Sequence, residues 1–199
     1  IEVWNSWFWN PLSVDDPETS LTASASPELA IYPNEKAISW WVSLVAGGAR
    51  VAAIAATDFH RKPQNIARPC TLVLASDRSE KAILAGIRAG RTIMTTHPRG
   101  PRVELQADAD HDGVFEATIG DTVPVSSALR IRVKNARGAI LRLKNGSAEL
   151  LRSTVTSADW VKEIGQRELA VASPSFVFAR VDSIVVHNLY AMTGALYLR

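Results

Sequence analysis

The sequence predicts an α/β segment followed by an all-β segment. In the first half of the chain, stretches with helical periodicity at residues 34–46 and 77–89 alternate with short apolar runs. From Arg91 onward the helical pattern fades, and apolar and polar residues alternate with a period of two. Several short strands with regular turn signals are typical of a β-sandwich. The second segment is therefore predicted to be a β-sandwich of the immunoglobulin-like kind.

The chain is expected to begin with a short strand at residues 1–4. Residues 5–33 form a long irregular stretch rich in Ser, Thr, Asp and Pro, and loops of this length are uncommon unless they are functional or disordered. Asn34 belongs to the residue types that cap helices, so a helix is expected to start there. A Gly-Gly pair after residue 46 ends it.

Two further strands and a second helix complete the α/β segment. Apolar runs at residues 50–56 and 71–75 predict strands on either side of a loop. Asp77 and Glu80 have the D-x-x-E spacing of a capping box, which predicts that a helix begins there. Gly90 ends this helix.

Alternating runs and turn residues define the strands of the second segment. Two such runs predict strands, RIRVK at residues 130–134 and AILRLK at residues 139–144. An Asn-Gly pair at 145–146 predicts a hairpin turn directly after the second run. FVFARV at residues 176–181 predicts another strand, with a further one at 183–186 after a short break.

The two segments are expected to meet near residues 97–101. Two prolines and a glycine interrupt the pattern there. The sequence thus predicts one domain at residues 1–97 and a β-sandwich domain at residues 98–199.

Composition excludes some classes of partner and leaves the compartment open. The 199 residues carry a net charge of +2 and contain no basic block interleaved with aromatic residues, so no nucleic-acid partner is predicted. No apolar run is long enough to span a bilayer, so no membrane partner is predicted. The single Cys70 excludes an internal disulfide and is compatible with either the cytoplasm or the periplasm.

The residues that point most clearly to chemistry follow the strand at 50–56. Asp58 and His60 are two positions apart, so on an extended chain they project to the same side. A carboxylate and an imidazole that converge suit a divalent metal such as zinc, manganese or iron. The alternative is a strand-to-loop junction in which Asp58 caps a turn and His60 lies on the surface.

Five stretches, in order along nearly the whole chain, resemble PHP-domain metallohydrolases of the CehA/McbA (carbaryl hydrolase-like) family. They are IEVWN at residues 1–5, the Trp-Trp helix, Gly-Gly turn and D-x-H strand at 37–61, the helix and A-G-R-T turn at 79–92, the Gly-Pro pair at 100–101, and AMTGALYLR at 191–199. In the last stretch Gly194 and Ala195 replace the Asn and Pro usual in the family.

The resemblance implies that residues 1–97 are the C-terminal portion of a PHP-type β/α barrel. It also implies a metal-dependent hydrolase in which metal-activated water attacks an ester, carbamate or phosphoester of a small-molecule substrate. Asp58 and His60 would be metal ligands at the rim of the barrel, where β/α-barrel enzymes place their active sites.

The family builds most of its metal cluster from an N-terminal H-x-H and from further residues in the middle of the barrel. No H-x-H occurs in this sequence. The chain is therefore expected to be part of a longer parent enzyme and to be inactive alone. The missing half of the barrel, or a second copy in a homo-oligomer, would cover its exposed faces.

Four residues near the expected metal site are predicted to contact substrate: Asn5, Trp4, Trp7 and Arg61. Trp4 and Trp7 belong to an aromatic cluster that either lines an apolar pocket or packs beneath the neighbouring loop. Arg61 either holds an anionic leaving group or is a solvated loop residue. Asn5 lies beside the site or is bonded to a neighbouring strand. Trp40 and Trp41, by contrast, lie in the middle of a predicted helix and are expected to be packing residues.

Two alternatives of other kinds stay open. Asp108, Asp110 and Asp112 begin the D-x-D-x-D-G pattern of a calcium loop, but the twelfth position is Ile119 and the flanks are strands. An Asp-Gly hairpin turn is therefore favoured over a calcium site. The whole chain could also be a non-catalytic binding or assembly module built on the β-sandwich.

Overall fold

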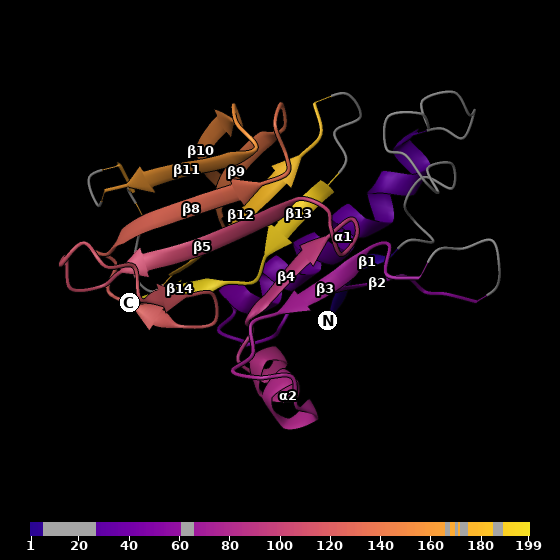
Figure 1. Cartoon of the computed structure of the whole chain (residues 1–199), viewed down its shortest axis with the longest axis horizontal. Coiled ribbons are helices and arrows are strands. Elements are labelled where there is room, and N and C mark those ends of the chain that lie inside the picture. Colours follow the sequence, from indigo (N-terminus) through magenta and orange to yellow (C-terminus); the bar gives the residue numbers. More distant parts are fainter. Residues whose placement is uncertain (6–26, 61–65, 166–167, 170, 172–174, 185–188) are drawn as a thin grey trace.

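The structure is a computed structural model of the chain. It describes residues 1–5, 27–60, 66–165, 168–169, 171, 175–184 and 189–199, with the backbone alone for residues 27–33. The described residues form three layers (Figure 1). A four-stranded sheet packs on one face of an eight-stranded sheet, and the other face of that larger sheet carries a long helix and a two-stranded parallel sheet.

The eight-stranded sheet is the central layer. Its main path runs in the order β10 (Ala148–Thr154), β9 (Ile140–Asn145), β12 (Ser175–Asp182), β13 (Leu189–Thr193), β4 (Thr92–Thr95) and β3 (Cys70–Val73). β14 (Leu196–Leu198) pairs with β12 and with β7 (Thr122–Val123). The hairpin expected after residue 144 is confirmed, because Asn145 pairs with Ala148 across Gly146 and Ser147.

The four-stranded sheet closes the sandwich. Its order is β11 (Asp159–Ile164), β8 (Ala128–Lys134), β5 (Arg102–Asp108) and β6 (Ala117–Thr118). Alternate residues of β8 are buried, and they meet the inward side chains of β9 and β12 in one core. Its fully buried members include Leu105, Ile131, Leu141 and Val177. The predicted β-sandwich is confirmed, since two sheets enclose a shared apolar core.

Helix α1 (Pro27–Ala46) covers the opposite face of the large sheet. It begins before Asn34, so the prediction that Asn34 caps its first turn was wrong. Proline is tolerated in the first turn of a helix because its missing N–H has no partner there in any case, and α1 starts at Pro27. Among the described residues, no helix is long and apolar enough to cross a membrane.

A second apolar core joins α1 to the sheet. Trp41 is fully buried and meets Phe178 and Phe176 of β12 edge to face, with ring centroids 5.2 and 6.2 Å apart. Its indole N–H donates to the carbonyl oxygen of Val51 at 2.8 Å. The predicted packing role of Trp41 is confirmed, whereas the neighbouring Trp40 is 57% exposed.

Strands β1 (Glu2–Asn5) and β2 (Ile54–Ala56) run parallel beside α1. β2 begins four residues later than the predicted strand at 50–56. The second helix, α2 (Glu80–Arg88), projects below the rest of the molecule in the view of Figure 1.

The cap of α2 differs from the predicted capping box. Ser79 is the capping residue, and its hydroxyl accepts the backbone N–H of Ala82 at 3.2 Å. Asp77 instead accepts the N–H of Ser79 at 2.7 Å. The prediction that Asp77 caps the helix was wrong because a serine two positions later already fills that place.

The large sheet continues across the predicted boundary at residues 97 and 98. Thr95 of β4 pairs with Ala191 of β13, and β3 extends the sheet further. The boundary itself falls in the connection between β4 and β5, and the division into two domains stays a prediction. Residues 183 and 184 are not in a strand, and the rest of the predicted strand at 183–186 lies outside the described residues.

Candidate metal site at the carboxyl end of β2

Strands β1 and β2 deliver their carboxyl ends to the same edge of the molecule. Because they are parallel, Asn5 at the end of β1 pairs with Ala56 at the end of β2. Just beyond β2, the hydroxyl of Thr57 donates to the carbonyl oxygen of Pro69 at 3.3 Å and accepts the N–H of Arg68 at 3.1 Å. These two bonds tie the segment after β2 to the segment that leads into β3.

Asp58 and His60 converge at this edge. Asp58 Oδ1 lies 2.8 Å from His60 Nε2, and the two side chains are 38% and 62% exposed. Asp58 has a φ of 50°, in the left-handed region, so the chain has already left the extended conformation. Aspartate is one of the residue types that adopt this conformation most readily. The predicted convergence is present, but a turn brings it about in place of strand alternation.

The two ligand atoms are about as far apart as neighbouring donors on an octahedral metal ion. Two donors bound at about 2.1 Å lie about 3.0 Å apart at the right angle of an octahedral site, and about 3.4 Å apart at the tetrahedral angle of a zinc site. The observed 2.8 Å separation is close to the first value and shorter than the second. A carboxylate and an imidazole are also the donor types that zinc, manganese and iron accept. The same distance serves a direct contact between the two side chains, so both predicted readings remain compatible with the geometry.

The pair alone is half of a metal site. Within the described part of the chain, no third carboxylate, imidazole or thiolate joins Asp58 and His60 to make a group of three potential ligands. Metal sites in proteins use three or four protein ligands. Any further ligand would have to come from outside the described residues.

The predicted substrate residues are distributed unevenly. Asn5 lies at the site edge, where its side chain donates to Glu2 Oε1 at 2.6 Å and its backbone N–H donates to Asn34 Oδ1 at 3.1 Å. Trp4 is 1% exposed and lies in the core cluster that also contains Trp41 of α1, while the loop beneath which it was expected to pack lies outside the described residues. Trp7 and Arg61 lie outside the described residues. A role in substrate binding stays a prediction for all four.

His97 lies at the same edge, which sequence reasoning did not foresee. Cys70 pairs with Thr95, so the residues that follow β4 come beside the start of β3 and the segment after β2. Burial, together with the charges of Arg68 and Arg99, lowers the pKa of His97 below its usual value. Its ring nitrogen Nδ1 accepts the backbone N–H of Arg99 at 3.3 Å. The pairing of β3 with β4 brings His97 to this edge, and no local pattern in the sequence predicts that pairing.

We expect His97 to titrate below about 6.5, the ordinary pKa of histidine, and the substitution Arg99→Gln to raise its pKa. Imidazole NMR signals followed against pH would measure both values. Since the unfolded chain binds the proton first as pH falls, this histidine makes the folded state less stable below about pH 6.5. Arg88→Gln, on α2, is the matched control and should leave the pKa of His97 unchanged. An unchanged pKa of His97 in Arg99→Gln would show that the charge of Arg99 does not lower it.

The acidic loop between β5 and β6 holds a second group of potential ligands. Carboxylate oxygens of Asp108, Asp110, Asp112 and Glu116 all lie within 4.8 Å of one another. All four side chains accept backbone N–H groups of the loop: Asp108 those of residues 111 and 113, Asp110 that of residue 112, Asp112 that of residue 114, and Glu116 that of residue 109. β5 and β6 do form a hairpin, but its last pair joins Ala107 to Ala117, so a loop over residues 108–116 replaces the tight Asp-Gly turn that was favoured. The carboxylates of this loop organise it by accepting its own backbone N–H groups.

Comparison with known proteins gives little that is close. No protein-family model and no curated protein matches the sequence. One similar solved structure is a two-domain protein from Bacteroides vulgatus ATCC 8482, described as containing a predicted PHP-like metal-dependent phosphoesterase. The identity is 15% and the TM-score is 0.29, over 97% of this chain and 61% of that protein. This chain thus spans about three-fifths of that protein's length. The likeness is too distant to establish a shared barrel or activity.

Proposed function

We propose that this chain is part of a PHP-type metal-dependent hydrolase and supplies Asp58 and His60 as two of its metal ligands. The observation that carries the proposal is the 2.8 Å approach of Asp58 Oδ1 and His60 Nε2 beyond the carboxyl end of a parallel strand. The family resemblance of the surrounding sequence supports it. When bound, a divalent metal would supply the Lewis acidity for hydrolysis of an ester, carbamate or phosphoester.

The residues of this chain would hold and orient the metal. The left-handed turn at Asp58 sets the carboxylate against the imidazole, and the two bonds of Thr57 fix the position from which that turn starts. Asn5 bounds the site on the β1 side. We further propose that the remaining ligands come from a preceding half of the barrel, so that the chain alone shows no multiple-turnover hydrolysis.

Metal titration of the purified chain tests the ligand assignment. We expect Zn²⁺ or Mn²⁺ to bind only weakly, because the chain supplies two ligands where metal sites use three or four. Asp58→Ala and His60→Ala should each weaken that binding further, at least about tenfold, since even the loss of a partner outside the ligands costs that much. Isothermal titration calorimetry measures both. The double variant Asp110→Ala/Asp112→Ala is the matched control, because it removes carboxylates of the acidic loop and leaves the edge at β2 intact.

Two outcomes would count against the proposal. Metal binding that survives both single substitutions would show that Asp58 and His60 are not ligands. Metal binding lost only in the acidic-loop variant would move the site to that loop. Either result would favour the other interpretation of the chain, a non-catalytic binding or assembly module.

A further inference from the structure

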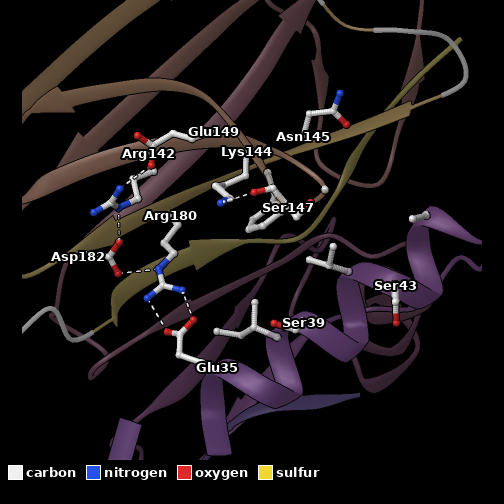
Figure 2. A pocket seen from close by; sticks show the side chains of 15 residues that line it. Glu35, Ser39, Ser43, Arg142, Lys144, Asn145, Ser147, Glu149, Arg180 and Asp182 are labelled. Carbon is white, nitrogen blue, oxygen red and sulfur yellow. Dashed lines mark hydrogen bonds and ion pairs between the residues drawn. The ribbon is translucent and has the colours of Figure 1, made fainter. Parts of the chain in front are cut away.

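A groove lies between α1 and the outer face of the large sheet, and neither Asp58 nor His60 is among the residues that line it (Figure 2). Its volume is about 910 Å³, within the range of small-molecule sites. One wall is the face of α1 that carries Glu35, Ser39 and Ser43, at the four-residue spacing of one helix face. The other walls are β9, β12 and the start of β10, with the turn at Gly146 and Ser147.

A continuous chain of ion pairs crosses the groove (Figure 2). Arg180 binds both carboxylate oxygens of Glu35, at 2.8 and 2.6 Å. Its Nε donates to Asp182 at 2.6 Å, and Asp182 accepts a second bond from Arg142 Nε at 3.1 Å. Arg142 in turn donates to Glu149 at 2.5 Å. Each of the two arginines therefore bridges two carboxylates.

The charges that line the groove balance one another. Three cations, Arg142, Lys144 and Arg180, face three carboxylates, Glu35, Glu149 and Asp182. A charged ligand would meet no net field of opposite sign and would have to compete with ion pairs that are already formed. Such competition is costly where the groups are buried, and the Asp182 side chain is 5% exposed. The lining thus favours a ligand without net charge.

The same side chains keep hydrogen-bonding capacity for a neutral ligand. Arg180 uses three of its five N–H donors in its bonds to Glu35 and Asp182, and ionised carboxylates have about four acceptor sites each. Lys144 gives one of its three donors to the carbonyl oxygen of Ser147, at 2.8 Å. Four apolar residues also line the groove: Ile38, Val42, Ala46 and Phe178. Ile38 and Phe178 are only 5% and 2% exposed, so Val42 and Ala46 offer most of the apolar surface.

We propose that this groove binds a neutral, hydroxyl-rich ligand, a saccharide. Each sugar hydroxyl both donates and accepts, so it can bond to a paired carboxylate or guanidinium and leave the pair intact. The C–H faces of a sugar ring can lie against the apolar lining. The site is separate from Asp58 and His60, and it does not depend on the hydrolase assignment.

A panel of neutral disaccharides, cellobiose, maltose and lactose, added to the whole chain tests the proposal. Glucuronate and citrate serve as charged comparisons. We expect at least one neutral disaccharide to bind with a Kd of about 1 mM and to shift backbone NMR signals of the groove. Ser43→Trp and Ser147→Trp, which fill the groove from opposite walls at exposed positions, should each weaken binding at least about tenfold, or about 1.4 kcal/mol.

Lys36→Trp is the matched control, because residue 36 is exposed on α1 and does not line the groove. It should leave saccharide binding unchanged. The proposal is overturned if none of the three disaccharides shifts groove signals, or if glucuronate or citrate binds more tightly than all of them. It is also overturned if both groove-filling variants bind saccharide as well as the unmodified chain.

Discussion

Replacing Trp41 by alanine is expected to lower the free energy of unfolding by about 3–5 kcal/mol. The indole is fully buried between α1 and the sheet and meets Phe178 and Phe176 edge to face. The substitution would leave a cavity beside both rings and would also leave the carbonyl oxygen of Val51 without the indole N–H that it accepts at 2.8 Å. Urea denaturation followed by circular dichroism measures the change.

Trp40 offers a control one residue away on the same helix. Its side chain is 57% exposed, so Trp40→Ala should change the free energy of unfolding by less than about 1 kcal/mol. Both variants gain the same small helix propensity from alanine. The difference between their free energies of unfolding therefore measures the contribution of burying Trp41. Equal losses in the two variants would mean that α1 does not pack on the sheet through Trp41.

The strands of the sandwich were predictable because one face of each is buried. In β8 the inward residues Leu129, Ile131 and Val133 are fully buried and the residues between them are not, which is the period-two pattern that the sequence displays. The Asn-Gly signal likewise placed the hairpin between β9 and β10 to within one residue. These features depend on local sequence, so local reasoning finds them.

The joining of the predicted segments was not predictable in the same way. β3 and β4 enter the sandwich sheet because Thr95 pairs with Ala191, nearly a hundred positions further along the chain. Strands pair through backbone hydrogen bonds, so the side chains of two strands this far apart in sequence do not reveal that the strands are neighbours. The early start of α1 was missed for a related reason. The side chain of Asn34 accepts the backbone N–H of Asn5, which is distant in sequence, and does not cap a helix terminus.

The candidate site was predictable in its residues and not in its geometry. The D-x-H spacing singled out Asp58 and His60, and the structure brings their side chains into contact. The left-handed turn at Asp58 and the arrival of His97 at the same edge depend on tertiary structure. A two-residue spacing fixes which side chains can meet, whereas the strand pairing around them decides what else is nearby.

The charged residues of β12 were also predictable in their position on the strand and not in their partners. Along FVFARVD, alternation puts Phe176, Phe178, Arg180 and Asp182 on one face, where two polar residues continue an apolar row. The sequence alone identifies no partner for them. In the structure Glu35 of α1 supplies one, so the ion pairs and the aromatic contacts fasten the same helix to the same strand.

We expect Arg180→Met to lower the free energy of unfolding by about 3–5 kcal/mol, because it removes one partner from a buried ion-pair network. Arg180 and Asp182 have side chains that are 14% and 5% exposed. Methionine keeps the apolar stem of the side chain, so most of the loss would come from Asp182 and Glu35, each left without this guanidinium. Arg132→Met is the control, since its pair with Asp159 is 40% and 49% exposed and should be worth less than about 1 kcal/mol.

The dependence on pH separates this effect from a packing defect. Burial raises the pKa of Asp182 above its usual value, against the opposing charges of Arg180 and Arg142. Removing Arg180 should raise that pKa further. A carboxyl whose folded-state pKa is raised lowers stability once pH exceeds its unfolded value of about 3.9, and the loss is complete above the folded-state pKa. The deficit of Arg180→Met should therefore be larger at pH 7 than at pH 4. A deficit independent of pH would show that the cost comes from lost packing.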